Sequence, residues 1–274
     1  MEAETFQAFQ EIAYSKAGIF LRQGKAALVQ ARLAKRLREL GLSSEREYLE
    51  RLRGESGSEE VVLFLDAIST NFTKFFREPD HFDALREHLA ALRAAGQRRF
   101  RLWSSACSSG EEPYTAAMVL DQVLEGCDWK ILATDISTRV LSRAAEGVYG
   151  EEEMEPVAEA LRARHFQLAP SATDGALRWA VKARLRERIV FRRLNLAARP
   201  YPMTGPLDAI LCRNVMIYFD LAARKHVTSS FHDKLREGGF LLLGHSESLL
   251  NVTADFELVH LKNDLVYRKP RSSP

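Results

Sequence analysis

The chain has few cysteines and no long apolar run, which argues against a disulfide-rich, zinc-binding or membrane-spanning protein. Only three of its 274 residues are cysteine (Cys107, Cys127 and Cys212), in no spacing typical of zinc ligands or of a disulfide framework, so we expect no metal. No stretch approaches the roughly 18 apolar residues of a membrane span, so we expect no membrane insertion. Glu2 and Glu4 stand where a secretion signal would be basic and then apolar, which predicts a cytoplasmic protein.

The chain also lacks the glycine patterns that bind nucleotide phosphates. The loop at 105–113 reads S-A-C-S-S-G-E-E-P, which is neither GxGxxG nor a P-loop and contains no lysine. Glu111 and Glu112 would repel a phosphate, so the loop suits a cationic or neutral ligand, unless these acids merely favour the start of a helix. The net charge is only +2, and we expect no nucleic-acid partner.

Hydrophobic periodicity divides the chain into two regions. Up to about Gly96 the apolar spacing is helical throughout, whereas from Arg99 onward apolar strands alternate with helices. This alternation predicts a doubly wound, mostly parallel α/β sheet preceded by a small all-helical region. The expected helices are 5–17, 25–40, 45–52, 59–69, 79–95, 113–124, 138–146 and 222–236, and the expected strands are 100–104, 130–134, 189–194, 207–212, 240–244, 256–261 and 264–268.

The pattern is less regular in two places. The last two strands flank Lys262-Asn263, which predicts a hairpin that ends the sheet with an antiparallel edge strand. Between Tyr149 and Glu187 the alternation weakens, and we expect a small insertion with one strand at 177–181.

Polar side chains follow the predicted strands, at the edge where a parallel sheet binds its ligands. Asp135 ends the second strand and could accept both hydroxyls of a ribose, or cap the next helix. Asn195 follows the third strand and suits an adenine edge, or simply starts a loop. The next buried strand leads into Arg213 and Asn214, with Tyr218 one turn later, either at a ligand crevice or as ordinary capping residues.

Together these features favour S-adenosylmethionine over a dinucleotide. That molecule joins an adenosine to a sulfonium and an amino acid head, and it contains no phosphate. A small-residue loop without a phosphate cradle, the carboxylates of Glu111 and Glu112, and the acid Asp135 after the second strand all suit it.

Six segments, in order along the chain, resemble the CheR-type chemotaxis receptor methyltransferases. The resemblance implies a class I S-adenosylmethionine-dependent methyltransferase domain at 79–270, a helical domain with its linker at 1–78, and a small β-subdomain inserted near 151–188. The matching segments are T-N-F-T-K-F-F-R-E-P (70–79), W-S-S-A with G-E-E-P-Y (103–106 and 110–114), A-T-D-I (133–136), L-N-L (194–196), C-R-N-V-M-I-Y-F-D (212–220) and G-H-S-E (244–247).

The resemblance also implies the residues of the site. The catalytic roles are our own assignment: Arg77 is a forked donor that orients a carboxylate of the cofactor or of the substrate, and Tyr218 packs or hydrogen-bonds beside the methyl group. The choice of Glu112 over Glu111 stays open. The cofactor contacts implied are Asn71, Thr73, Arg77, Ala106, Glu112, Asp135, Asn195, Leu196, Arg213 and Asn214.

The activity implied is transfer of a methyl group from S-adenosylmethionine to glutamate carboxylates of chemoreceptors (methyl-accepting chemotaxis proteins), giving methyl esters for sensory adaptation and S-adenosylhomocysteine as product. Such carboxylates are ionised near pH 7, so no general base is needed. An amino-methylating nucleic-acid enzyme would carry Asn/Asp-Pro-Pro-aromatic where this chain has Arg213-Asn214-Val215-Met216. The alternatives are a non-catalytic adaptor that keeps the pocket and a methyltransferase acting on another protein or nucleic acid.

Two further expectations concern surfaces. Lys25, Arg32 and Arg36 fall on one face of a predicted helix, and the resemblance favours this face docking onto the acidic coiled coil of a receptor over being merely solvated. In some members the β-subdomain grips a receptor C-terminal peptide, and for this chain that stays open. For the aromatic residues Phe72, Phe75 and Phe76 we expect core packing under the linker.

Overall fold

The computed structural model describes residues 1–54, 57–169, 175–261 and 265–271. Its first region is helical, and a cluster of apolar side chains between Phe6 and Ile68 forms a core of its own. Gly18 and Gly41 end the first two long helices in the left-handed conformation that a non-glycine residue rarely adopts. The elements are α1 (Ala3–Ala17), η1 (Gln23–Lys25), α2 (Ala26–Leu40), α3 (Glu45–Arg53) and α4 (Gly57–Ile68).

The second region is the predicted doubly wound sheet. Its seven strands lie in the order β6-β2-β1-β7-β8-β10-β9, and neighbouring strands are parallel except where β10 pairs with β8 and β9. The strands are β1 (Arg99–Ser104), β2 (Asp128–Asp135), β6 (Ile189–Arg193), β7 (Leu207–Cys212), β8 (Leu235–Leu243), β9 (Glu257–His260) and β10 (Leu265–Arg268), and the helices are α5 (Asp80–Ala94), α6 (Glu111–Val123), α7 (Thr138–Glu146), η2 (Met216–Tyr218) and α11 (Leu221–Lys234).

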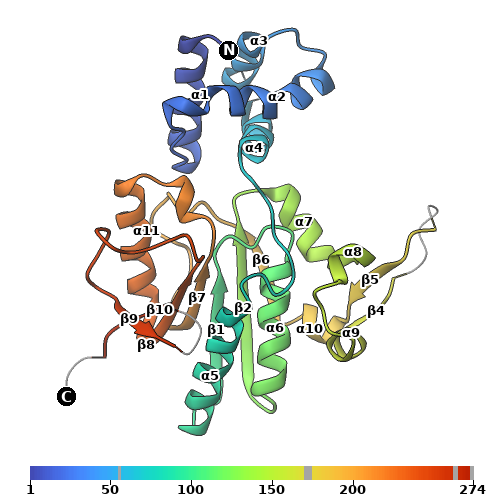
Figure 1. Cartoon of the computed structure of the whole chain (residues 1–274), viewed down its shortest axis with the longest axis vertical. Helices are drawn as coiled ribbons and strands as arrows, with labels where there is room; N and C mark the ends of the chain where they lie inside the picture. The colour runs from blue at the N-terminus through green and yellow to red at the C-terminus, as the bar shows by residue number, and fades with distance from the viewer. Residues whose placement is uncertain (55–56, 170–174, 262–264, 272–274) are drawn as a thin grey trace.

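Alternating side chains of the strands feed two cores. Leu102 and Ala209 face a core shared with α5 and α6, whereas Trp103 and Ile210 face a second core that includes Phe231 of α11. The Trp103 and Phe231 rings meet edge to face with their centroids 5.2 Å apart. The sheet is therefore covered on both faces, and its carboxyl edge points toward the helical domain (Figure 1).

The structure differs from the sequence prediction at the start of β8. Leu235 and Arg236 belong to the strand and not to the preceding helix, because Leu235 is buried and pairs with Leu207 of β7. The predicted antiparallel hairpin at the edge of the sheet is confirmed: β10 pairs with β8, and β9 is the outermost strand. Lys262-Asn263, the predicted turn, lies outside the described residues.

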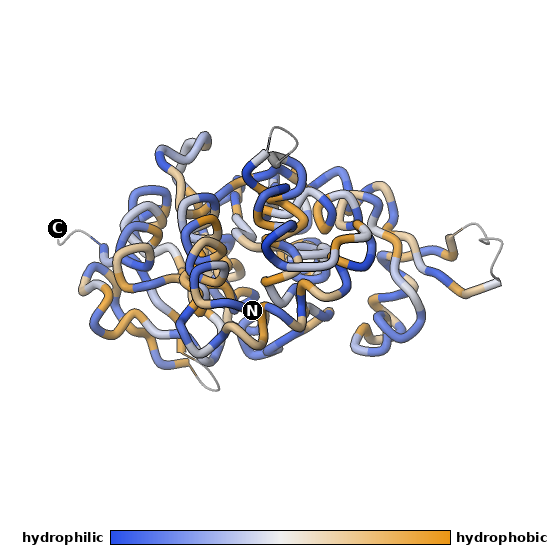
Figure 2. The backbone as a smooth tube through the Cα atoms, turned by 90° about the horizontal axis from the view of Figure 1, so that it is seen from above, coloured by the Kyte–Doolittle hydropathy of each residue, from blue (hydrophilic) through white to orange (hydrophobic). Residues whose placement is uncertain are grey.

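The insertion holds a separate three-stranded antiparallel sheet, ordered β3-β5-β4. The expected strand at 177–181 is present as β5 (Arg178–Val181). Seen from above, the insertion projects from the side of the molecule opposite the C-terminus (Figure 2). Its other elements are β3 (Val148–Gly150), α8 (Glu151–Met154), α9 (Glu159–His165), β4 (Phe166–Leu168) and α10 (Ala183–Arg186).

Candidate functional site

A cavity lies at the carboxyl edge of the sheet, below the helical domain. Its floor comes from the ends of β1, β2, β6 and β7, and its other wall is the linker that joins the helical domain to α5. The structure brings every predicted cofactor residue and both predicted catalytic residues to its lining. These are Asn71, Thr73, Arg77, Ala106, Glu112, Asp135, Asn195, Leu196, Arg213, Asn214 and Tyr218.

The helical domain itself contributes to this lining. Ala17 and Ile19, at the end of α1, line the cavity, and the Asn195 amide donates to the Lys16 carbonyl at 2.8 Å. Gly18 lies between Ala17 and Ile19, and a Cβ at this position would lie 2.7 Å from the Cβ of Ala197. Sequence reasoning assigned no site role to this part of the chain, because its residues are small or apolar and show no pattern typical of ligand binding.

Asp135 sits at the end of β2 with both carboxylate oxygens partly satisfied. One oxygen accepts the N–H of Ser108 at 2.9 Å and the other accepts that of Ser137 at 3.0 Å. Burial raises the pKa of Asp135, and these N–H groups oppose that shift. Each carboxylate oxygen can accept a further bond, which two adjacent hydroxyls of a ribose would supply.

The two glutamates of the first loop differ in position. Glu112 lines the cavity, whereas Glu111 turns to the Ser109 hydroxyl, 2.8 Å from one carboxylate oxygen. Glu112 accepts from Ser104 at 2.6 Å and from the Arg213 guanidinium at 3.1 Å. The cavity geometry therefore favours Glu112 for contact with a bound cation.

Arg213 is the most enclosed charge of the site. Its side chain is 1% exposed, lies over the Phe82 ring, and pairs with Glu112 and Glu78, each at 3.1 Å. It also donates to His81 Nδ1 at 3.0 Å and to the Arg77 carbonyl. Burial raises the pKa of Glu78, but the Arg213 charge and the hydrogen bond from the Asn214 side chain hold it at about 2. The guanidinium thus joins the linker to the strand ends.

Glu78, His81 and His245 place ligand atoms within 4.8 Å of one another, a spacing that a metal ion could bridge. The Arg213 guanidinium already supplies a positive charge at this position, because it donates to both Glu78 and His81. A metal at this position would have to displace a buried guanidinium from its carboxylate, so the donor set favours the guanidinium.

The linker wall is held by hydrogen bonds from the sheet domain and within the linker itself. The Tyr218 hydroxyl accepts the Thr70 N–H at 3.0 Å and lies 3.2 Å from the Thr70 carbonyl. Ser108 donates to the Asn71 carbonyl at 3.1 Å, and Arg77 donates to the Phe72 carbonyl at 2.7 Å. These bonds keep Asn71 and Thr73 over the cavity.

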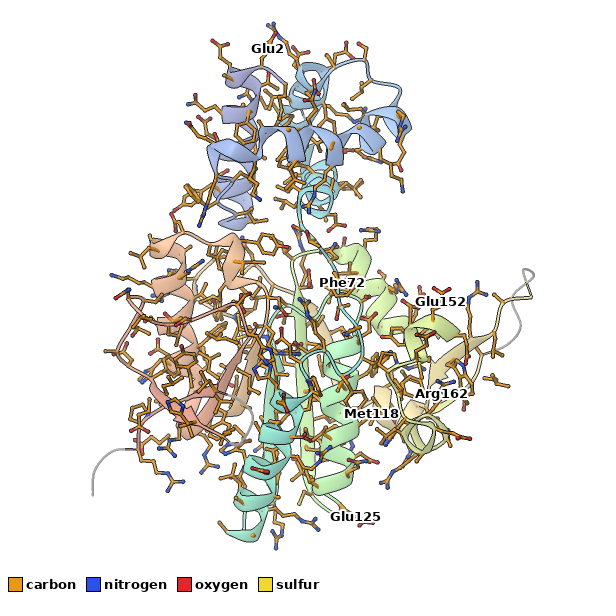
Figure 3. The ribbon with its side chains drawn as sticks, viewed as in Figure 1. Glu2, Phe72, Met118, Glu125, Glu152 and Arg162 are labelled. Carbon is orange, nitrogen blue, oxygen red and sulfur yellow. The ribbon has the colours of Figure 1, made fainter. Side chains whose placement is uncertain are left out.

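Core packing is confirmed for two of the three linker aromatics and is wrong for Phe72. Phe75 is fully buried and meets Tyr149 edge to face, and Phe76 packs against Phe82. Phe72 is 64% exposed, lines the cavity and lies 5.4 Å from the Arg77 guanidinium, at the junction of the two domains (Figure 3). The exposed ring of Phe72 thus belongs to the cavity and not to the core under the linker.

The three predicted docking cations occupy different environments. Lys25 is exposed. Arg36 forms a two-pronged pair with the buried Glu60, at 2.8 and 2.7 Å. Arg32 donates to Thr70 at 2.6 Å and to the Ile68 carbonyl, so it ties α2 to the start of the linker.

Comparison with known proteins agrees with this site. Residues 71–265 match the family described as CheR methyltransferase, SAM binding domain, and residues 4–69 match its all-alpha domain. The chemotaxis protein methyltransferase of Escherichia coli (strain K12) is 39% identical over 255 residues, covering 92% of this chain and 87% of that protein. Chemotaxis protein methyltransferase 2 of Pseudomonas aeruginosa (strain PAO1) is 40% identical over 252 residues, covering 91% and 88%.

The donor set of the cavity fits the cofactor that the family name states. Asp135 offers paired acceptors for a ribose, Glu112 offers a carboxylate for an ammonium group, and the short loop between them has no phosphate cradle. No helix among the described residues is long and apolar enough to cross a membrane. The chain belongs to the CheR methyltransferase family and is an S-adenosylmethionine-dependent methyltransferase.

Proposed function

We propose that this protein transfers the methyl group of S-adenosylmethionine to glutamate side-chain carboxylates of chemoreceptors, forming methyl esters for sensory adaptation. The observation that carries the proposal is the cavity at the carboxyl edge of the sheet, which unites Asp135, Glu112, Arg77 and Tyr218. The relatives' names, as chemotaxis protein methyltransferases, supply the substrate class.

In this proposal Asp135 accepts the ribose hydroxyls and Glu112 accepts the ammonium group of the cofactor. Asn195 and Leu196 lie beside the adenine, and Ala106 permits close approach of the backbone. Asn71, Thr73, Arg213 and Asn214 complete the wall. The product that remains is S-adenosylhomocysteine.

The chemistry proposed is a direct displacement. A carboxylate oxygen of the substrate glutamate bonds to the methyl carbon while the sulfur–carbon bond breaks, and sulfur keeps the electron pair. Charge disappears in the transition state, so tight ionic binding of the carboxylate would stabilise the ground state more than the transition state. The protein therefore gains most by excluding water and aligning oxygen, carbon and sulfur.

Arg77 and Tyr218 take the orienting roles. Arg77 is about a quarter exposed and is the cavity guanidinium that can turn toward an incoming carboxylate, because Arg213 is fully engaged. Tyr218 is fixed by Thr70 and presents its ring to the cavity. Among the described lining residues there is no histidine or cysteine, which agrees with a reaction that needs no general base.

For the receptor we propose two contacts. The face formed by Lys25 and, on α2, by Arg32 and Arg36 docks onto the acidic coiled coil, with Lys25 in direct contact and the exposed Lys35 at the border of this face. Arg32 and Arg36 act there mainly by holding α2 in place.

The second contact is a receptor C-terminal peptide at the small sheet of the insertion. Among the described residues, β4 lies at the edge of this sheet and pairs with β5, so its outer edge can add a strand. Leu168, 58% exposed, offers an apolar contact beside that edge. A synthetic peptide of the receptor terminus, titrated by calorimetry, tests this contact separately, and no heat of binding would exclude it.

The function is tested by incubating the protein with methyl-labelled S-adenosylmethionine and membranes that contain chemoreceptors. Release of volatile labelled methanol by alkali would establish a carboxyl methyl ester. Alkali-stable label would mean methylation of nitrogen or another atom and would contradict the substrate. Cofactor binding without any transfer would favour the adaptor instead.

A further inference from the structure

The G-H-S-E segment after β8 carries a carboxylate that the proposed chemistry does not use. One oxygen of Glu247 accepts the N–H groups of Asn214 and Gly244, each at 2.7 Å. The other accepts the N–H of Ile217 at 3.3 Å. Three backbone donors from two separate loops thus converge on one side chain.

Two of these donors, the N–H groups of Asn214 and Ile217, lie where the backbone has no helical or strand hydrogen-bond partner. Strand β7 ends at Cys212 and η2 begins at Met216, so the first N–H groups of this short helix have no carbonyl of their own helix to bond. Asn214 has φ 59°, in the left-handed region that non-glycine residues seldom adopt. A carboxylate gives charge-assisted bonds to such donors and holds this unusual backbone.

The two loops approach as closely as backbone permits. A Cβ on Gly244 would lie 2.4 Å from the Asn214 side-chain nitrogen and 3.0 Å from its backbone nitrogen. The Glu247 N–H donates to the Gly244 carbonyl at 2.8 Å, and this turn points the carboxylate back toward the β7 loop. Gly244 therefore permits the close approach of the two loops, and Glu247, three residues later, supplies the carboxylate that joins them.

The segment held in this way carries much of the cavity wall. Arg213, Asn214 and Tyr218 all line the cavity, and the Asn214 side chain donates to Glu78 at 3.3 Å. We propose that Glu247 is a positioning residue for methyl transfer, whose carboxylate fixes the backbone from Asn214 to Ile217 and thereby places Asn214 and Tyr218 at the cofactor. The kinetic part of this inference rests on the proposed function, and its structural part does not.

The test uses the full chain with Glu247→Gln, which keeps the volume but sets an amide N–H₂ against backbone N–H donors. Glu247→Asp keeps the charge but is one methylene shorter. Asp255→Asn is the matched control, since this exposed acid follows the same turn and bonds only its neighbour Thr253 in the described structure. The measurements are amide NMR resonances of Asn214 and Gly244, calorimetric affinity for S-adenosylhomocysteine, and kcat on receptors.

With Glu247→Gln we expect both amide resonances to move upfield and kcat to fall about tenfold to a hundredfold, because small misplacements near the reacting atoms are costly. The affinity for S-adenosylhomocysteine should weaken by a smaller factor. Glu247→Asp should lie between Glu247→Gln and the wild type. The control should match the wild type in all three measurements.

Unmoved amide resonances in Glu247→Gln would overturn the inference. A lower melting temperature of Glu247→Gln, with kcat and affinity equal to those of the control, would also overturn it. Glu247 would then stabilise the fold without positioning the cavity wall. If the wild type transfers no methyl group to receptors, the proposed function fails, but the resonances and the affinity still decide whether Glu247 positions the cavity wall.

Discussion

Arg36 in the helical domain and Arg213 at the sheet edge are both predicted contact residues, and both are engaged inside the protein. Arg36 pairs with Glu60, whose carboxylate also accepts from the Tyr48 hydroxyl at 2.8 Å. Arg213 pairs with Glu78 and Glu112. A guanidinium paired with carboxylates thus occurs in two regions, but Arg36 holds one carboxylate with two nitrogens, whereas Arg213 bridges two carboxylates.

The difference lies in what each pair faces. Arg36 is 21% exposed on the outer surface of α2, so its pair closes a core. Arg213 is 1% exposed to solvent but lines the cavity, so its pair sets the charge that a ligand meets. Breaking the first pair should therefore change stability alone, whereas breaking the second should change stability and binding together.

The largest effect is expected for Arg213→Met. Removing the guanidinium leaves the buried Glu112 without its cationic partner and takes one partner from Glu78, which costs about 3–5 kcal/mol of unfolding free energy. Chemical denaturation and calorimetry with S-adenosylhomocysteine should show losses in both. Arg213→Lys keeps the charge without the fork and should recover part of each, and full stability with intact binding in Arg213→Met would contradict the comparison.

Arg77 is the second arginine of the cavity and, unlike Arg213, it is partly exposed to solvent. Arg77→Ala should lower kcat about a hundredfold, because alignment of the substrate carboxylate is lost, while affinity for S-adenosylhomocysteine changes far less. Steady-state kinetics beside calorimetry separates the two quantities. Equal losses in turnover and product affinity would argue against an orienting role.

Glu60→Gln tests the pair that faces away from the site. It should cost about 1.5–3 kcal/mol of unfolding free energy, through weaker bonds to Arg36 and Tyr48. Cofactor affinity should stay at the wild-type value. A weaker affinity would show that the helical core and the cavity are coupled.

The two carboxylates also predict the pH dependence of stability. The pKa of Glu60 is lowered by its Arg36 hydrogen bond, and that of Glu78 is held at about 2. A lowered folded-state pKa gives stability that is present above the ordinary glutamate value and is lost as pH falls. Denaturation midpoints should therefore drop between pH 4.5 and about 2, and less steeply in Glu60→Gln.

The smallest effect is expected from exposed cations. Lys25→Glu with Lys35→Glu should raise KM for receptor about threefold to tenfold at low salt, and less at high salt, with unchanged cofactor affinity. The matched control is Arg192→Glu with Lys225→Glu, the same charge change at exposed positions away from α2. Equal kinetics for the two double variants would indicate that the α2 face is simply solvated.

Periodicity predicted most of the fold because each element buries one face. The helix at 138–146 and the strand at 207–212 have the predicted bounds. Most of the insertion was not predicted, because strands of three residues such as Val148–Gly150 are too short to show an alternation. The end of α11 was misplaced because Leu235 suits the last turn of a helix as well as a strand.

The sequence by itself determined the two-part architecture and the family, and through the family motifs a part of the cavity lining, since these depend on local patterns and ordered motifs. It did not predict Ala17, Ile19 or Phe72 in that lining. Only the tertiary structure decided which charges remain available. Arg36 finds Glu60 across 24 residues, Arg213 finds Glu78 across 135, and Glu247 finds Asn214 across 33. Partners so distant in sequence leave no periodic trace, because packing of separate elements alone brings them together.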